Sequence, residues 1–118
     1  MHIIFGREKA QALQNKYTVL ELDTFRVENS NDVIPAYCIV ENLAILDLPD
    51  LARWKNLHTE LIENYGQQNW TFCQQALEHL VGKWGGELDS FYQDLDSRIQ
   101  SYMKNAPGSD WTPVILKA

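Results

Sequence analysis

Histidines, acidic residues and one glycine turn are the features of this 118-residue sequence that could do chemistry. The three histidines, His2, His58 and His79, stand apart from one another and form neither a His-Glu-x-x-His motif nor a Cys/His cluster at zinc spacing. His58 lies in an apolar stripe, so we expect a core-edge residue with a hydrogen-bonded ring, whereas His79 falls on the polar face of a helix. The sequence therefore nominates no catalytic residue, no metal ligand and no cofactor.

The densest acidic cluster could in principle bind a hard cation, because carboxylate oxygens are the ligands that such ions prefer. It consists of Glu87, Asp89, Asp94 and Asp96. These residues lack the Asp-x-Asp-x-Asp-Gly pattern of a calcium loop, and helical register separates Glu87 and Asp94 from the other two. We expect a solvated acidic face.

A turn at Gly6, between a short strand and a helix, offers backbone amides with Arg7 and Lys9 beside them. Amides at a helix N-terminus favour anions, so Gly6, Arg7 and Lys9 form the one candidate ligand site, for a phosphate-like anion. A single glycine matches neither the Rossmann nor the Walker pattern, and a plain turn residue is the alternative.

The composition is that of an ordinary folded protein, 45% hydrophobic and 22% charged, with a formal net charge of −6. Binding to a nucleic-acid backbone needs clustered Lys and Arg, so this class of partner is disfavoured. Cys38 and Cys73 lie in apolar contexts without Cys-x-x-Cys spacing, which predicts two buried thiols in a reducing compartment. No apolar segment approaches membrane-spanning length, and we expect a cytoplasmic protein with no membrane contact.

The first part of the chain predicts a small sheet. Residues 2–5 form a short strand and residues 7–15 a short amphipathic helix, and YTVLELDTFRV and VIPAYCIVE form an antiparallel hairpin around a turn at 28–32. The second hairpin strand is apolar on both faces, which predicts a central position. Residues 43–46 (LAIL) predict a short edge strand that ends before Pro49.

The following part predicts helices. Residues 51–65 have the cleanest amphipathic spacing in the chain, and Gly66 is the expected C-cap. From Trp70 to Met103 apolar residues recur at steps of four and three, so we expect one helix, bent at its glycines, that packs antiparallel to the first. The alternative is a break at Gly85 and Gly86, because glycine costs roughly 1 kcal/mol in a helix interior. The predicted core consists of Trp54, Leu57, Leu61, Cys73, Leu77, Leu80, Trp84, Leu88 and Phe91.

Strands that precede helices indicate an α+β fold. We expect a small, mainly antiparallel sheet of three or four strands, a short N-terminal helix and a C-terminal antiparallel pair of longer helices. The length predicts one domain over residues 1–118, with a sheet-forming part at 1–47, a helical part at 51–103 and a C-terminal loop and tail at 104–118.

Several small or apolar positions predict an interface. In a continuous helix Gly82 and Gly86, four residues apart, would share a face and let another backbone come close. The apolar C-terminal end needs cover, and so does the strand face at 33–39, for which the short first helix offers little. The predicted interface consists of Gly82, Gly86, Trp111, Val114, Ile115 and Leu116, and a C2 homodimer is the commonest closed arrangement.

Two segments, IIFGREKAQALQNKYTVLELDTF and WTFCQQALEHLVGKWGGELDSFYQDL, carry a resemblance that spans most of the chain. In them the sequence resembles small uncharacterised proteins of T4-like tailed phages of marine cyanobacteria. The resemblance implies an intracellular protein made during infection, with a non-enzymatic role. It transfers no activity and no site residue.

The leading functional hypothesis is a small intracellular protein–protein interaction module that associates with itself or binds another protein. The alternative is a small enzyme or ligand-binding domain whose site lies between sheet and helices and uses His58 or the Gly6 turn. A large apolar contact between copies would favour the module, and a pocket with converging polar groups would favour the alternative.

Overall fold

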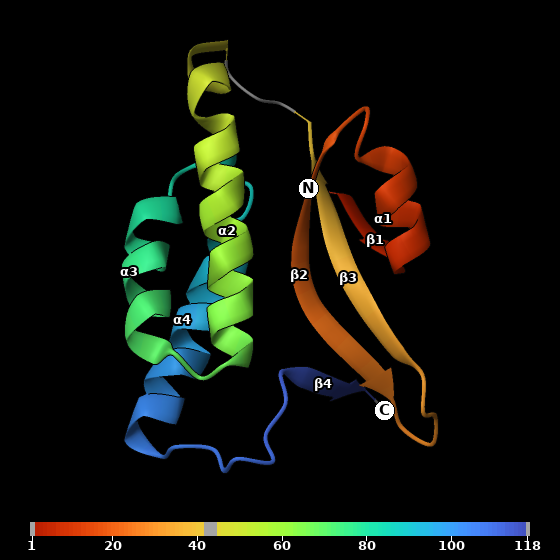
Figure 1. Ribbon diagram of the computed structural model, residues 1–118, viewed down its shortest axis with the longest axis vertical. Helices are drawn as coiled ribbons and strands as arrows, with labels where there is room; N and C mark the ends of the chain where they lie inside the picture. The colour runs from red at the N-terminus through yellow and green to blue at the C-terminus, as the bar shows by residue number, and fades with distance from the viewer. Residues whose placement is uncertain (1, 42–44, 118) are drawn as a thin grey trace. The chain divides into compact units, whose positions relative to one another are not determined.

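The computed structural model describes residues 2–41 and 45–117 (Figure 1). The chain forms two compact units, Met1–Glu41 with Pro113–Ala118, and Asn42–Thr112. The first unit holds a four-stranded, mainly antiparallel sheet and a short helix, and the second holds the longer helices. The predicted α+β fold is confirmed, and the sheet also takes in the C-terminal tail.

The sheet of the first unit has the strand order β1-β3-β2-β4. Its strands are β1 (His2–Phe5), β2 (Thr18–Val27), β3 (Val33–Val40) and β4 (Val114–Lys117). β1 and β2 pair antiparallel with β3, which is central as predicted, whereas β4 pairs parallel with β2. In the hairpin turn Asn29 adopts a left-handed φ of 68°, a conformation that asparagine tolerates better than most residues.

A bulge interrupts the β2–β3 ladder. Glu21 pairs with Tyr37 and Thr24 with Pro35, so three steps along β2 match two along β3. Pro35 has no N–H to donate to the ladder, and a bulge is one of the places where a strand accepts proline. The bulge therefore lies next to Pro35, a position that cannot donate a ladder hydrogen bond.

The helix α1 (Arg7–Leu13) packs on one face of the sheet (Figure 1). Its Ala10 is buried with Val19 and Ile39, and Ile4, Leu13 and Tyr37 pack around them. This corrects the expectation that α1 offers too little cover for the 33–39 strand face, because a small residue such as Ala10 lets the helix approach the sheet closely. Only Val33, at the start of β3, stays 51% exposed.

The second unit contains a 3-10 helix η1 (Ile45–Asp50) and the helices α2 (Leu51–Gly66), α3 (Trp70–Leu80) and α4 (Asp89–Lys104). α2 and α3 lie side by side and antiparallel, as predicted, with α4 behind them (Figure 1). The edge strand predicted at 43–46 is wrong for residues 45 and 46, which belong to η1. Residues 43 and 44 lie outside the described part of the chain. The left-handed residue after α2 is Gln68, with φ 61°, in place of the expected Gly66.

The expected single helix over Trp70–Met103 is wrong. α3 ends at Leu80, a short 3-10 turn η2 (Trp84–Gly86) follows, and α4 begins at Asp89. Trp84, Gly85 and Gly86 all adopt left-handed φ, at 57°, 64° and 79°. The break at these glycines, which was the alternative prediction, replaces one long helix by two.

The predicted core is confirmed almost entirely. Eight of its nine residues are at most 8% exposed, and Leu57 is half-buried. Both cysteines are fully buried thiols. Burial raises the pKa of the Cys73 thiol from 9.0 to about 11, partly offset by a backbone hydrogen bond.

Candidate functional site

The Gly6 turn lines a hollow of about 650 Å³ in the first unit, together with Arg7 and Lys9. The structure thus brings the three predicted ligand residues together. However, the Gly6 N–H donates to Pro35 O at 2.9 Å, and α1 has only seven residues. Glu8 and Glu21 also line the hollow and balance its two cations. The balanced charges of the hollow give no added support for anion binding, and the anion site stays a prediction.

His58 has the structural role predicted for it. Its side chain is 1% exposed, and its Nδ1 lies 2.9 Å from the hydroxyl oxygen of Tyr92. The indole N–H of Trp84 donates to the same oxygen at 3.1 Å, so the hydroxyl proton of Tyr92 can be donated to His58. The trio holds α2, η2 and α4 together inside the second unit. His79 is exposed, as predicted, and His2 lies on the surface 3.5 Å from Glu41.

The acidic cluster is divided among separate roles. Asp89 accepts a hydrogen bond from the Gly82 N–H at 2.8 Å and so ties the end of α3 to the start of α4. Asp96 accepts from the side chain of Gln100, and Asp94 is exposed. Within residues 2–41 and 45–117 no group of three or more His, Cys, Asp or Glu could hold a metal ion.

The predicted interface residues lie in different surroundings. Gly82 and Gly86 do not share a helix face, because the helix breaks between them and both adopt positive φ. Trp111 is half-buried in an aromatic cluster with Tyr65, Trp70 and Tyr102, at ring-centroid distances of 5.3 to 5.5 Å.

The C-terminal run at 114–116 forms β4, where Thr24, Phe25 and Arg26 of β2 pair with Val114, Ile115 and Leu116. Much of the cover that this end was expected to need therefore comes from the chain itself. An interface at these residues stays a prediction.

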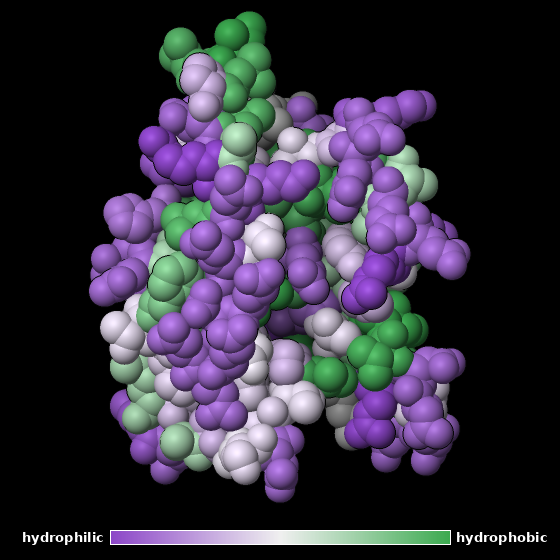
Figure 2. All heavy atoms as spheres, viewed as in Figure 1, coloured by the Kyte–Doolittle hydropathy of each residue, from purple (hydrophilic) through white to green (hydrophobic). Residues whose placement is uncertain are grey.

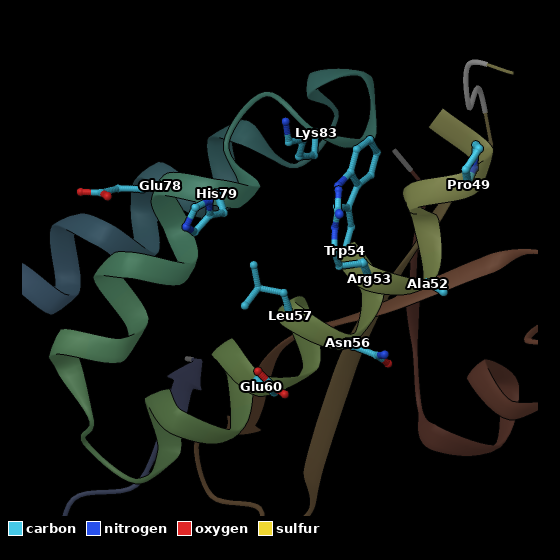
Figure 3. A pocket seen from close by; sticks show the side chains of 10 residues that line it. All are labelled: Pro49, Ala52, Arg53, Trp54, Asn56, Leu57, Glu60, Glu78, His79 and Lys83. Atoms are coloured by element: carbon cyan, nitrogen blue, oxygen red, sulfur yellow. The ribbon is translucent and has the colours of Figure 1, made fainter. Parts of the chain in front are cut away.

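The second unit has a groove of about 950 Å³ between α2 and α3, called the α2/α3 groove below (Figure 3). Leu57 points into it, and the Lys83 ammonium lies 5.5 Å from the ring centroid of Trp54. Behind this ring lies Trp84, packed edge to face at 5.6 Å. His79 and Arg53 also line the groove, and so do the acidic Glu60 and Glu78, so the groove carries side chains of both charges.

The most exposed apolar side chains of the second unit lie beside this groove. On η1, Ile45 is 82% exposed, Leu46 is 89% exposed and Leu48 is 55% exposed. Figure 2 shows hydrophobic residues gathered at the end of the helical unit where η1 lies. We call these three residues the η1 apolar segment. Contiguous apolar surface of this kind is typical of interaction sites.

The sequence contained a signal for this segment that the strand interpretation missed. Pro49 and Asp50 stand directly before a strongly amphipathic helix, and 3-10 turns are frequent at the N-termini of α-helices. Five apolar residues within six positions, 43–48, do not alternate as a half-buried strand does. The groove, in contrast, depends on the distance between α2 and α3 and has no sequence signal.

None of the helices in the described part of the chain combines the length and the apolarity needed to cross a bilayer. No family model, curated protein or solved structure matches this chain, so its function rests on the geometry above.

Proposed function

We propose that this chain is a small protein–protein interaction module that associates with itself. The observation that carries the proposal is the η1 apolar segment, three apolar side chains that are each more than half exposed, beside the α2/α3 groove. Leaving such side chains in water forgoes about 1.5–3 kcal/mol for each one that could be buried. A surface with this much unburied apolar area gains by contact with another protein.

The proposal includes a reducing, cytoplasmic setting. It is supported by Cys38 and Cys73, which are both buried thiols. Reducing compartments keep cysteines as thiols, whereas disulfides are common in oxidising compartments.

A second candidate function is the binding of a small molecule in the α2/α3 groove. It is favoured by the volume of about 950 Å³, which lies at the upper end of small-molecule sites, and by the polar groups of His79 and Lys83. Against it, the acidic Glu60 and Glu78 line the groove beside His79 and Lys83, so its polar groups do not converge on a ligand of one charge.

Co-purification of two differently tagged copies tests self-association. When both are expressed in one cell, capture of one tag should recover the other copy in comparable amount at micromolar protein. As a control, the two tagged copies are purified separately, diluted to nanomolar concentration and then mixed. Capture of one tag should then recover much less of the other copy. Recovery of one tag alone at every concentration contradicts the proposal.

A further inference from the structure

The η1 apolar segment carries an acidic side chain between its apolar ones. Asp47 lies between Leu46 and Leu48 and has no ionic partner among the residues that the structure describes. Asp50, the other acid of η1, is already paired with Arg53 at 2.9 Å. The segment therefore presents apolar groups and one uncompensated carboxylate.

The α2/α3 groove offers the complementary chemistry. Leu57 supplies apolar surface inside the groove, and Lys83 and His79 supply hydrogen-bond donors at the end near η1. The Lys83 ammonium lies over the face of Trp54 and has no carboxylate partner within residues 2–41 and 45–117, so its N–H groups are able to bind a carboxylate. The groove is also lined by Arg53, which is paired with Asp50, and by the acidic Glu60 and Glu78. Glu60 lies at the end of the groove opposite Lys83 (Figure 3), so the Lys83 ammonium is the basic group that can meet the carboxylate of an apolar segment.

The segment and the groove adjoin on one surface of the second unit. Pro49 belongs to η1 and also lines the groove (Figure 3). The segment does not fill the groove of its own chain, because its three apolar side chains are each more than half exposed and none of them lines the groove. Self-complementary surfaces of this kind are what a two-fold interface requires, since the same patch is used on both copies.

We infer that two copies dock reciprocally, each placing its η1 apolar segment in the α2/α3 groove of the other, with Asp47 of one copy bonded to Lys83 of the second. The inference rests on the proposed self-association and names the surface that performs it. Each Asp47–Lys83 pair is a local attraction that offsets part of the general repulsion between two chains of net charge −6.

Sedimentation velocity of full-length variants tests the inference. Leu46→Glu should raise the dimer dissociation constant by at least about tenfold, because it places a charge in the apolar contact. Met103→Glu is the matched control. Met103 is an exposed apolar residue like Leu46, at 50%, but it lies near the end of α4 and does not line the groove. The dimer dissociation constant of this variant should stay within about twofold of the wild-type value. Both positions are on the surface, and circular dichroism should show unchanged folding.

A charge exchange supplies the second measurement. Asp47→Lys and Lys83→Glu should each weaken the dimer several-fold, and the double variant should return to within about threefold of the wild type, since the pair is restored with opposite signs. Unchanged association in Leu46→Glu, equal loss in Met103→Glu or no recovery in the double variant overturns this interface while self-association stands. A wild type that stays monomeric overturns both.

Discussion

The hydroxyl group of Tyr92 forms hydrogen bonds with two other buried polar side chains of the helical unit, His58 and Trp84. It accepts the indole proton of Trp84 and lies in hydrogen-bond contact with His58 Nδ1, and all three side chains are at most 1% exposed. The apolar stripe around His58 predicted its burial, but no sequence pattern pointed to a partner 34 positions away. Long-range polar pairs depend on how helices pack, which local spacing does not encode.

Tyr92→Phe should lower the free energy of unfolding by about 1–3 kcal/mol, because it leaves the buried indole N–H of Trp84 without an acceptor. Urea denaturation measures the change. Tyr102→Phe is the control, since its half-buried ring stacks on Trp70 at 5.2 Å and its hydroxyl makes no hydrogen bond within the described residues. Equal losses in the two variants would mean that the hydroxyl of Tyr92 contributes nothing specific.

The thiol of Cys73 predicts a pH dependence of stability. Its pKa is raised to about 11 by burial, so the folded state holds the proton more tightly than the unfolded state, where the pKa is near 9.0. The resulting stabilisation is complete below pH 9 and is lost as pH rises towards 11, by up to about 3 kcal/mol.

Urea titrations between pH 8 and 11 should therefore show a steeper loss of stability in the wild type than in Cys73→Ala, which lacks the titrating group. The comparison of slopes removes the contributions of tyrosines and lysines that titrate in the same range. Parallel slopes would show that the thiol of Cys73 is not desolvated as described.

The elements follow local sequence signals closely, except at η1, where a strand was predicted, and between α3 and α4, where glycines compete with an apolar pattern. Period-two and period-3.6 patterns predicted β1, β2, β3, α1 and α2 within a few residues. Between α3 and α4 the apolar pattern continued through the glycines because Trp84 and Leu88 are buried from the connection itself, at 0% exposure. A stripe of apolar residues reports burial, and burial does not require the helix to be continuous.

The helix break predicts effects of different size for two glycine substitutions. Gly82 has a φ of 86° and Gly108 a φ outside the left-handed range, and neither has an atom within 4 Å of the position that a Cβ would occupy. Gly82→Ala should lose about 1–2 kcal/mol through backbone strain alone, whereas Gly108→Ala should change stability by less than about 0.5 kcal/mol. A gain in stability for Gly82→Ala would indicate a helical residue and so restore the continuous helix.

At the scale of the whole molecule, the C-terminal tail was the least predictable part. Its apolar composition predicted an end that needs cover, but its parallel pairing with β2 joins residues about ninety positions apart. The same holds for the α2/α3 groove, which arises from the separation of two helices. Both features depend on the assembled structure. The pairing of β4 covers one apolar surface that was expected to be exposed, while η1 exposes another.

The most direct measurement of the central claim is the mass of the full-length chain by sedimentation equilibrium between about one and fifty micromolar, a range in which stable interfaces of standard size persist. Self-association predicts an average mass that rises with concentration towards twice the 13.7 kDa of one chain. A mass that stays at 13.7 kDa across the whole range contradicts the claim, and with it the assignment of this chain as a self-associating interaction module.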